Sequence, residues 1–375
     1  MKLRKTFIQE VIVYMTREED VSRKIEIIRQ YMEERKTDGV LLSKVDNFAW
    51  ITSGARSYVA LDDKTGVASA LITKNDAYIL SKNPETERLK CEELPKNFTV
   101  VEYPWFANLD DMVNNVVDGK RLLYEEDPEF NNFLLRTRIK LSEYEQERYA
   151  EVGAKTAYAL ENAMKSLSPN MTEIQVKSLV ESHLAKEGLD VLLVLAFGDE
   201  SRMLYRHNLA RNVEIGKRCF VSVCTKMHGL VISATRTIEF EKDEKFESQH
   251  EINARIDSEI LDATLTKRTI SQVFFEIERA YTFHGYPDEW KLHHQGGIAG
   301  YNTREIVATP HFSFQIGDAM SFAWNPTITG TKSEDTYIRT KNKMRLLSVN
   351  EDRDWPYLEI DVNGRRYKRP GILIL

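Results

Sequence analysis

Three histidines are the side chains of this sequence that are best suited to move a proton at neutral pH. His207 lies nine residues after Gly198, and His293 and His294 are adjacent residues that precede a pair of glycines. An imidazole with an unperturbed pKa of about 6.5 both accepts and returns a proton in this range. The residue type therefore allows acid–base chemistry here, and the alternative is that these histidines are packed or bonded to the backbone as structural residues.

The pair His293 and His294 is expected to place only one ring in a shared pocket. Successive side chains of a strand point to opposite faces of the sheet, so two adjacent rings on a strand diverge. Gly296 and Gly297, which follow closely, allow the backbone to approach a ligand. The sequence alone does not decide which of the two rings faces the pocket.

A second group of polar side chains lies further along the chain. Arg304 can clamp a substrate carboxylate through two guanidinium nitrogens, or it can pair with Glu305 or Glu334. Lys332 is two residues from Glu334 on a predicted strand, so it shares the face of Glu334 and is expected to neutralise it. The amide of Asn325 can donate a hydrogen bond to a carbonyl or a developing oxyanion. This group predicts ion pairing and polarisation of a substrate.

Four segments, read in chain order, resemble the pita-bread superfamily of aminopeptidase P, prolidase, methionine aminopeptidase and creatinase. They are residues 195–207, 220–237, 293–305 and 320–336. The resemblance covers nearly the whole chain. It implies an α/β N-terminal domain followed by an α+β pita-bread domain, in which helices flank a curved antiparallel sheet.

The peptidases of this superfamily hold two metal ions with two Asp, one His and two Glu, and most of these positions carry neutral side chains here. The run Thr235-Arg236-Thr237 anchors the comparison, and Arg236 itself is expected to form a structural ion pair. The matching positions are Ser222 and Ser233 for the two Asp, His294 (or, with a poorer fit, His293) for the His, and Asn325 and Glu334 for the two Glu.

The charge of this residue set argues against a dinuclear metal site. Two divalent cations bring four positive charges, and Glu334 is the one carboxylate retained. Serine and asparagine oxygens are poor ligands for Mg²⁺ or Mn²⁺, and Zn²⁺ prefers His, Cys or carboxylate. Cys224, two residues after Ser222, does not restore the set by itself. The sequence therefore predicts a site without metal or any other cofactor.

The resemblance to creatinase, the metal-independent member of the superfamily, implies a mechanism, because there the histidine at the position of His207 handles the proton. The leading hypothesis is a metal-independent hydrolase or lyase that acts on a C–N bond. Its cationic side chains disfavour creatine and favour a small, carboxylate-bearing substrate. The catalytic residues are predicted to be His207, His294 and Glu334, and the substrate-binding residues His293, Arg304, Glu305, Asn325 and Lys332.

Two alternatives stay open. One is a non-catalytic binding module, as in the histone-chaperone domains that share the pita-bread fold. The other is a divergent Xaa-Pro aminopeptidase or prolidase. Binding modules do not need His207, His294 and Glu334, so these residues favour an enzyme.

Composition agrees with a cytoplasmic protein. The 375 residues are 42% hydrophobic and carry a net charge of −6, which gives no general reason to expect nucleic acid as a partner. The three cysteines form no regular framework and are expected to be reduced. No apolar run approaches the length of a membrane span. The resemblance further implies a homodimer.

The pattern of elements predicts two domains, residues 1–140 and 141–375. In the first, helical charged segments alternate with strands at 68–73, 77–81 and 98–103, and residues 39–54 are predicted to form a strand and a turn. In the second, Ser142 with Glu145 and Thr172 with Gln175 have the spacing of capping boxes. Strands at 189–197, 219–225 and 230–238, helices at 247–264 and 270–284, and further strands are predicted to follow.

Overall fold

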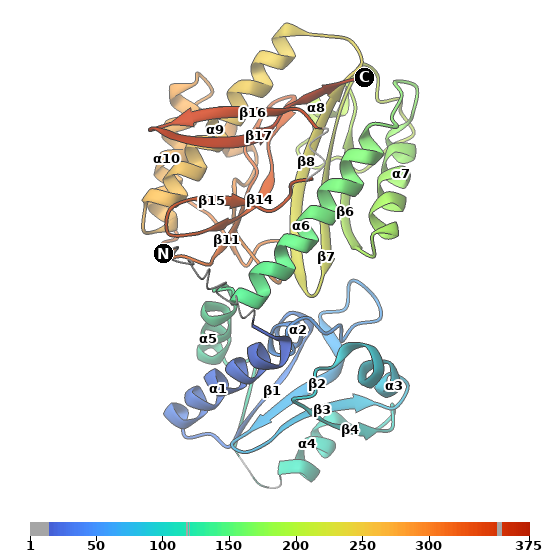
Figure 1. Cartoon of the computed structure of the whole chain (residues 1–375), viewed down its shortest axis with the longest axis vertical. Coiled ribbons are helices and arrows are strands. Elements are labelled where there is room, and N and C mark those ends of the chain that lie inside the picture. The colour runs from blue at the N-terminus through green and yellow to red at the C-terminus, as the bar shows by residue number, and fades with distance from the viewer. Residues whose placement is uncertain (1–14, 118, 120, 351–354) are drawn as a thin grey trace, which may run out of the picture.

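A five-stranded sheet forms the centre of the N-terminal part of the chain (Figure 1). The computed structural model describes residues 15–117, 119, 121–350 and 355–375. In sheet order, the strands are β4 (Thr99–Tyr103), β3 (Ala77–Lys82), β2 (Thr65–Thr73), β1 (Gly39–Lys44) and β5 (Leu122–Tyr124). The pairs β1–β2 and β2–β3 are antiparallel, whereas β1–β5 and β3–β4 are parallel.

The helices of this part include one that was predicted incorrectly. They are α1 (Arg17–Arg35), α2 (Val45–Ile51), α3 (Thr86–Arg88), the π-helix η1 (Leu89–Glu93), α4 (Leu109–Val117) and α5 (Pro128–Arg138). The prediction of a strand and a turn at 39–54 holds for β1 but not for α2. Residues 47–51 are all buried. The prediction failed because a short segment that is buried on every side shows no hydrophobic periodicity by which a helix could be distinguished from a strand.

Capping boxes begin the first two helices of the C-terminal part, as the sequence predicts. The hydroxyl of Ser142 accepts a hydrogen bond from the backbone of Glu145, whose side chain bonds back to Ser142, and α6 (Glu143–Met164) follows. Thr172 and Gln175 make the same pair at α7 (Glu173–Lys186). These caps satisfy amide groups that would otherwise lack partners at the helix ends.

Two larger sheets form the C-terminal part, which combines helices with largely antiparallel strands as expected. The first has the order β18 (Ile372–Ile374), β8 (Leu230–Glu239), β7 (Arg218–Met227), β6 (Asp190–Phe197). The second has the order β10 (Ile306–Val307), β9 (Gly296–Ala299), β11 (Ser321–Trp324), β14 (Asp335–Arg339), β15 (Met344–Leu346). Two-stranded sheets are formed by β12 (Thr327–Ile328) with β13 (Thr331–Lys332), and by β16 (Tyr357–Val362) with β17 (Arg365–Pro370).

The two larger sheets meet where β8 passes the chain that leads into β14. The backbone amide of Thr235 donates to the carbonyl of Glu334 at 2.8 Å, and this contact replaces a continuous strand ladder. Helices α6 and α7 pack on the first sheet, while α9 (Glu244–Thr266) and α10 (Ile270–Phe283) lie beside the second (Figure 1). The junction therefore brings segments that are about 100 residues apart in sequence into contact.

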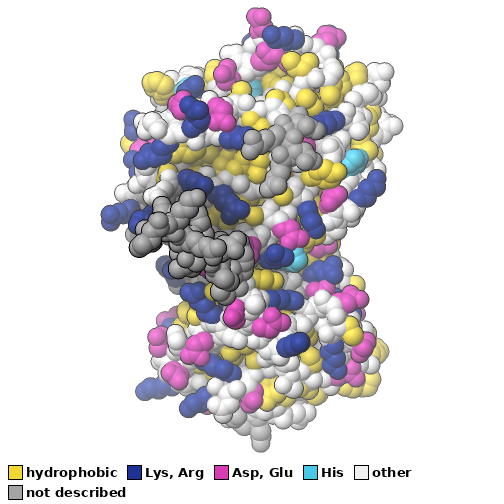
Figure 2. Space-filling model, in the orientation of Figure 1, with side chains coloured by type: hydrophobic (Ala, Val, Ile, Leu, Met, Phe, Trp, Pro, Cys, Tyr) yellow, Lys and Arg dark blue, Asp and Glu magenta, His cyan; other side chains and the backbone are white. Residues whose placement is uncertain are grey.

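The outer surface mixes charges of both signs. Figure 2 shows Lys and Arg interspersed with Asp and Glu over the described part of the visible face. Among the described residues, no helix combines the length and the apolar character that crossing a membrane requires.

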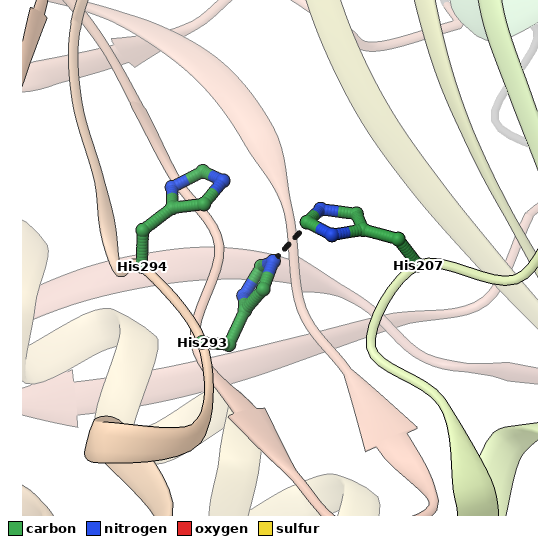
Figure 3. Close-up of side chains that lie close together, drawn as sticks. All are labelled: His207, His293 and His294. Atoms are coloured by element: carbon green, nitrogen blue, oxygen red, sulfur yellow. Dashed lines mark hydrogen bonds between the residues drawn. The ribbon is translucent and has the colours of Figure 1, made fainter.

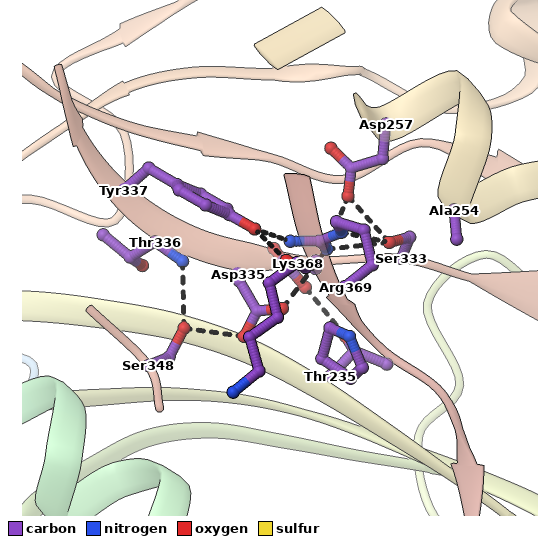
Figure 4. Close-up of polar contacts among 12 residues, drawn as sticks. Thr235, Ala254, Asp257, Ser333, Asp335, Thr336, Tyr337, Ser348, Lys368 and Arg369 are labelled. Atoms are coloured by element: carbon purple, nitrogen blue, oxygen red, sulfur yellow. Dashed lines mark hydrogen bonds and ion pairs between the residues drawn. The ribbon is translucent and has the colours of Figure 1, made fainter. Parts of the chain in front are cut away.

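A buried network of ion pairs stabilises the sheet junction (Figure 4). Arg236 on β8 pairs with Glu161 of α6 at 2.8 Å and with Asp335 at 2.9 Å, so it forms the structural ion pair that we expected. Arg369 pairs with Asp257 of α9 at 2.5 Å and with Asp335 at 3.2 Å. Both arginine side chains are fully buried. The network thus links both sheets to the helices that cover them.

Replacing Arg236 by leucine should destabilise the protein strongly. The carboxylates of Glu161 and Asp335 would lose a buried partner, and breaking a buried pair in this way costs about 3–5 kcal/mol. Urea unfolding followed by circular dichroism measures the loss. The matched control is Arg345→Leu, at an exposed position of β15, which should change stability by less than about 0.5 kcal/mol. Equal unfolding midpoints for the two variants would show that the network contributes little.

Candidate active site

Three imidazole rings lie together in the C-terminal part of the chain (Figure 3). The Nε2 atoms of His207 and His293 are 3.2 Å apart, so one of these two nitrogens donates a hydrogen bond to the other. The ring centre of His294 is 4.5 Å from that of His293 and 6.0 Å from that of His207. The structure therefore brings together all three histidines that the sequence singled out.

The expectation that only one of His293 and His294 faces the shared pocket is wrong. Both residues lie between the 3-10 helix η2 (Glu289–Leu292) and β9, and β9 begins only at Gly296. Because they precede the strand, their side chains do not have to alternate between two faces of a ladder. His293 is buried and His294 is exposed.

His207 lies on a loop whose neighbouring side chains are fixed. The loop follows the short helix α8 (Ser201–Leu204). Arg206 donates to Glu289 at 2.5 Å and to Thr329 at 2.8 Å, and Asn208 donates to the carbonyl of Ala196 at 2.6 Å. These contacts on both sides of His207 hold its ring against the His293–His294 segment.

All three imidazoles are neutral at neutral pH. Burial lowers the pKa of each ring, and the nearby charge of Lys332 lowers the pKa of His207 and His293 further. The pKa of His293 falls to about 2, and that of His294, which is next affected by Arg304, falls to about 4. The negative charge of Glu334 acts in the opposite direction but does not reverse these shifts. At neutral pH each ring therefore has one N–H donor and one nitrogen that can accept a hydrogen bond.

Glu334 lies between two cations. Its Oε1 is 2.9 Å from Nη2 of Arg304, and its Oε2 is 2.9 Å from Nζ of Lys332. Burial alone would favour the protonated acid, but the two cations and their hydrogen bonds outweigh burial and lower the pKa of Glu334 to about 2. Lys332 thus neutralises Glu334 as predicted, and of the interactions considered for Arg304 the structure shows the pair with Glu334.

The hydroxyls at the predicted metal-ligand positions bond to other protein groups. Ser222 on β7 lies 2.7 Å from the hydroxyl of Thr235, which in turn donates to Glu334 at 3.2 Å. Ser233 accepts a hydrogen bond from Nη1 of Arg304 at 3.1 Å. Sequence reasoning used Thr235 only to anchor the comparison and missed its place in the site. The signal was its spacing of two residues from Ser233, which puts both on one strand face.

Of the other two predicted residues, Asn325 lies beside the histidines and Glu305 does not. The backbone amide of Asn325 donates to the carbonyl of Gln295 at 3.1 Å, so Asn325 lies next to the His293–His294 segment, and its buried Oδ1 has no partner among the described residues. Glu305 is instead paired with Arg138 of α5 at 2.6 Å. The structure thus leaves Glu305 outside the group around Glu334, as a contact between the N-terminal and C-terminal parts.

Comparison with known proteins identifies the family of this chain and solved structures that are similar to it. The model of metallopeptidase family M24 matches residues 147–344, which is more than half of the chain. The chain belongs to metallopeptidase family M24. A comparison with curated proteins finds no match.

Solved structures similar to this M24 chain include three peptidases. The prolidase of Pyrococcus horikoshii OT3 has a TM-score of 0.72 at 19% identity, covering 88% of this chain and 99% of its own. The Xaa-Pro dipeptidase of Bacillus anthracis has a TM-score of 0.70 at 17% identity, with the same two coverages. The X-Pro aminopeptidase of Thermotoga maritima has a TM-score of 0.70 at 16% identity, covering 87% and 97%. At these identities the likeness shows the shared pita-bread fold, and the family match supports a hydrolase.

The M24 family name implies metal, but the residues of this chain do not fit a dinuclear centre. Ser233 and Glu334, at two of the ligand positions, both accept hydrogen bonds from Arg304, and Lys332 occupies the other oxygen of Glu334. A cation placed there would meet a guanidinium and an ammonium. Electrostatic repulsion and the neutral oxygens of Ser222 and Asn325 therefore disfavour divalent ions at these positions.

The three histidines are the group of described residues that can offer ligand atoms to a single ion. One nitrogen from each lies within 4.8 Å of the others, and three histidines with one open position are a known pattern of catalytic zinc sites. Lys332 and Arg304 are close enough to lower the histidine pKa values, and the same positive charges oppose a divalent ion.

Stability should fall as the pH is lowered from 6.5 to 4.5, partly because of His293. An unfolded histidine binds a proton below about pH 6.5, whereas His293, with its pKa lowered to about 2, stays neutral in the folded protein. The unfolded state then binds more protons, so each such histidine removes up to about 1.4 kcal/mol per pH unit. Urea unfolding at several pH values should give a shallower decline for His293→Gln than for the wild type. The exposed control His311→Gln should keep the wild-type slope, and an unchanged slope in His293→Gln would contradict this account.

Proposed function

We propose that this M24 protein is a hydrolase that cleaves a C–N bond of a small, carboxylate-bearing substrate without a dinuclear metal centre. The observation that carries the proposal is the pairing of Glu334 with both Lys332 and Arg304, next to three neutral imidazoles. Two side-chain cations contact Ser233 and Glu334, which are at positions where the family would need metal ligands. Their charge is available for ion pairing, and the imidazoles are available for proton transfer.

The charges of the site favour an anionic substrate group. Lys332 and Arg304 contribute two positive charges and Glu334 one negative charge, so this buried trio carries a net charge of +1 at neutral pH. The neutral histidines do not change that sum. A carboxylate near Lys332 or Arg304 would balance it, and a charge-assisted hydrogen bond of this kind is stronger than one between neutral groups.

His207 is the proposed proton carrier. As a neutral base it takes a proton from water, whose oxygen forms a bond to the substrate carbon, and it then returns this proton to the departing nitrogen as the C–N bond breaks. The contact with His293 Nε2 orients the ring of His207. Asn325 lies beside the same segment, and its proposed role is to donate a hydrogen bond through its side-chain amide to the oxygen on which negative charge develops.

Two other functions make different predictions for the same site. A divergent Xaa-Pro aminopeptidase or prolidase would need metal at positions where Arg304 and Lys332 already provide cations. A non-catalytic binding module would not need three clustered histidines. The hydrolase proposal accounts for both features.

Removing the imidazole of His207 should abolish most of the activity. The assay measures the release of free amine from a panel of amino-acid-derived amides, guanidines and Xaa-Pro dipeptides. For a substrate that is turned over, His207→Ala should lower kcat by about 10²–10⁴-fold, which is the usual contribution of general acid–base catalysis. The control His311→Ala, at an exposed position, should keep the wild-type kcat. Unchanged turnover in His207→Ala would exclude this proton carrier, and saturable binding of a protein partner without any turnover would favour the binding module.

Activity should not depend on added or bound divalent metal. Elemental analysis of protein purified without chelator should find Mn, Co and Zn far below one ion per chain, because Lys332 and Arg304 oppose a cation. Turnover should survive dialysis against a chelator. A stoichiometric ion that is lost together with turnover on chelation, and restored with it, would contradict the proposal. If such an ion were found, its loss from the His294→Ala variant would show that the three histidines bind it.

A further inference from the structure

A buried lysine outside the candidate active site lacks an acidic partner. Lys226 on β7 is 8% exposed, and its ammonium lies 3.8 Å from the ring centre of Tyr58. In the part of the chain that the structure describes, no hydrogen bond or ion pair reaches its Nζ. By contrast, the buried Lys24 pairs with Asp20 and Glu145, and Lys332 pairs with Glu334. An unpaired buried charge is costly, so Lys226 requires a different explanation.

The acids nearest to Lys226 are engaged elsewhere. Asp190 faces Lys226 across the β6–β7 ladder, but its carboxylate accepts the hydrogen bond of the Tyr58 hydroxyl. Asp46 pairs with Arg138 at 3.1 Å and accepts a hydrogen bond from Asn302. Burial lowers the pKa of Lys226, and the charges of Asp190 and Asp46 oppose this shift without reversing it. The ammonium is therefore only partly compensated by the protein.

Lys226 lines a cavity of about 340 Å³ between the N-terminal and C-terminal parts. The tip of the β7–β8 hairpin points toward α2 in Figure 1. At that tip Gly229 packs so closely against Ala49 that a side chain at position 229 would clash, since its Cβ would lie 2.5 Å from the Cβ of Ala49. Apolar walls come from Leu61, Leu192 and Val231. A cavity of this volume and character is typical of sites for small ligands.

Five charged residues besides Lys226 line the cavity, and none of them is fully buried. The charges of Lys44 and Lys64 balance those of Asp62 and Asp63, and the charge of Asp46 is paired with Arg138. Among the described charged residues of this lining, Lys226 alone is buried. A ligand therefore meets a mixed edge and then a single buried cation.

We propose that this cavity binds a small carboxylate with a short apolar body, whose carboxylate pairs with the ammonium of Lys226. The ring of Tyr58 covers the ammonium on one side, and a cation–π contact of this kind offsets only part of the cost of burying an unpaired ion. A bound carboxylate would supply the missing partner, while the apolar body would lie against the leucine and valine side chains.

The cavity lies on the same sheet face as the candidate active site. Ser222, Cys224 and Lys226 are two residues apart on β7, so their side chains share a face, and Lys226 is about 13 Å further along the strand than Ser222. Thr303, which lines the cavity, directly precedes Arg304. The inference does not rest on the proposed function, because it concerns binding and none of its residues belongs to the group around Glu334.

The test compares a carboxylate with its neutral amide. Ligand-observed nuclear magnetic resonance titrations would use 4-methylpentanoate and 4-methylpentanamide, which have nearly the same shape. The wild type should bind the carboxylate saturably, and at least about tenfold more tightly than the amide, because a hydrogen bond to a charged group is worth about 1.5–3 kcal/mol. Lys226→Met should lose this preference. The matched control Lys64→Met, at the exposed edge of the same cavity, should change the affinity by less than about twofold.

Two results would overturn the inference. Equal binding of amide and carboxylate to the wild type, or no saturable binding of either, would show that Lys226 serves only as a contact to Tyr58. Unchanged carboxylate binding in Lys226→Met would show the same. If Lys226→Met does not fold, Lys226→Arg keeps the charge and should keep the preference for the carboxylate, whereas its loss in a folded Lys226→Arg variant would count against the inference.

Discussion

The pairing of Glu334 with Lys332 and Arg304 is the interaction on which the rest of the site depends. Glu334 is almost fully buried, and a carboxylate in that position would be protonated if it had no cationic partner. The two cations keep it ionised and fix both of its oxygens. Burial is the main cause of the lowered pKa values of the adjacent imidazoles, and the two cations add to it. The ion-paired group thus contributes to the protonation state of the histidines as well as fixing that of Glu334.

Side chains point in alternate directions along residues 332–335, where Ser333 and Glu334 connect β13 to β14, and this alternation separates the site from the structural network. Lys332 and Glu334 point toward the histidines, whereas Ser333 and Asp335 contact the buried arginines. Taken together, the buried cations are Arg236, Arg304, Lys332 and Arg369, and the buried acids are Glu161, Asp257, Glu334 and Asp335. Each of these charged side chains has at least one partner of opposite charge. This pairing explains how so many charges can be buried at one sheet junction.

The sequence predicts the parts of this arrangement that depend on local spacing. The structure confirms the capping boxes at Ser142 and Thr172. It also confirms the pairing of Lys332 with Glu334, which was predicted from their spacing of two residues. The resemblance located the histidines. The two sheets meet through contacts of Ser233 and Thr235 with Thr336 and Glu334, about 100 residues away, which no periodicity in the sequence records. The adjacent rings of His293 and His294 were predicted to diverge because a strand was assumed where the chain is irregular.

The substitutions at the metal-ligand positions are coupled to each other. An aspartate restored at position 233 would lie next to Arg304 and would form an ion pair with it, not a metal ligand, because Arg304 already donates to Ser233. A glutamate restored at position 325 would add a buried charge without supplying the other carboxylates. Recovering a dinuclear centre would require the loss of Lys332 and Arg304 together with the gain of acids. Both oxygens of Glu334 already have cationic partners, so the protein itself compensates the charge that a metal ion would otherwise compensate.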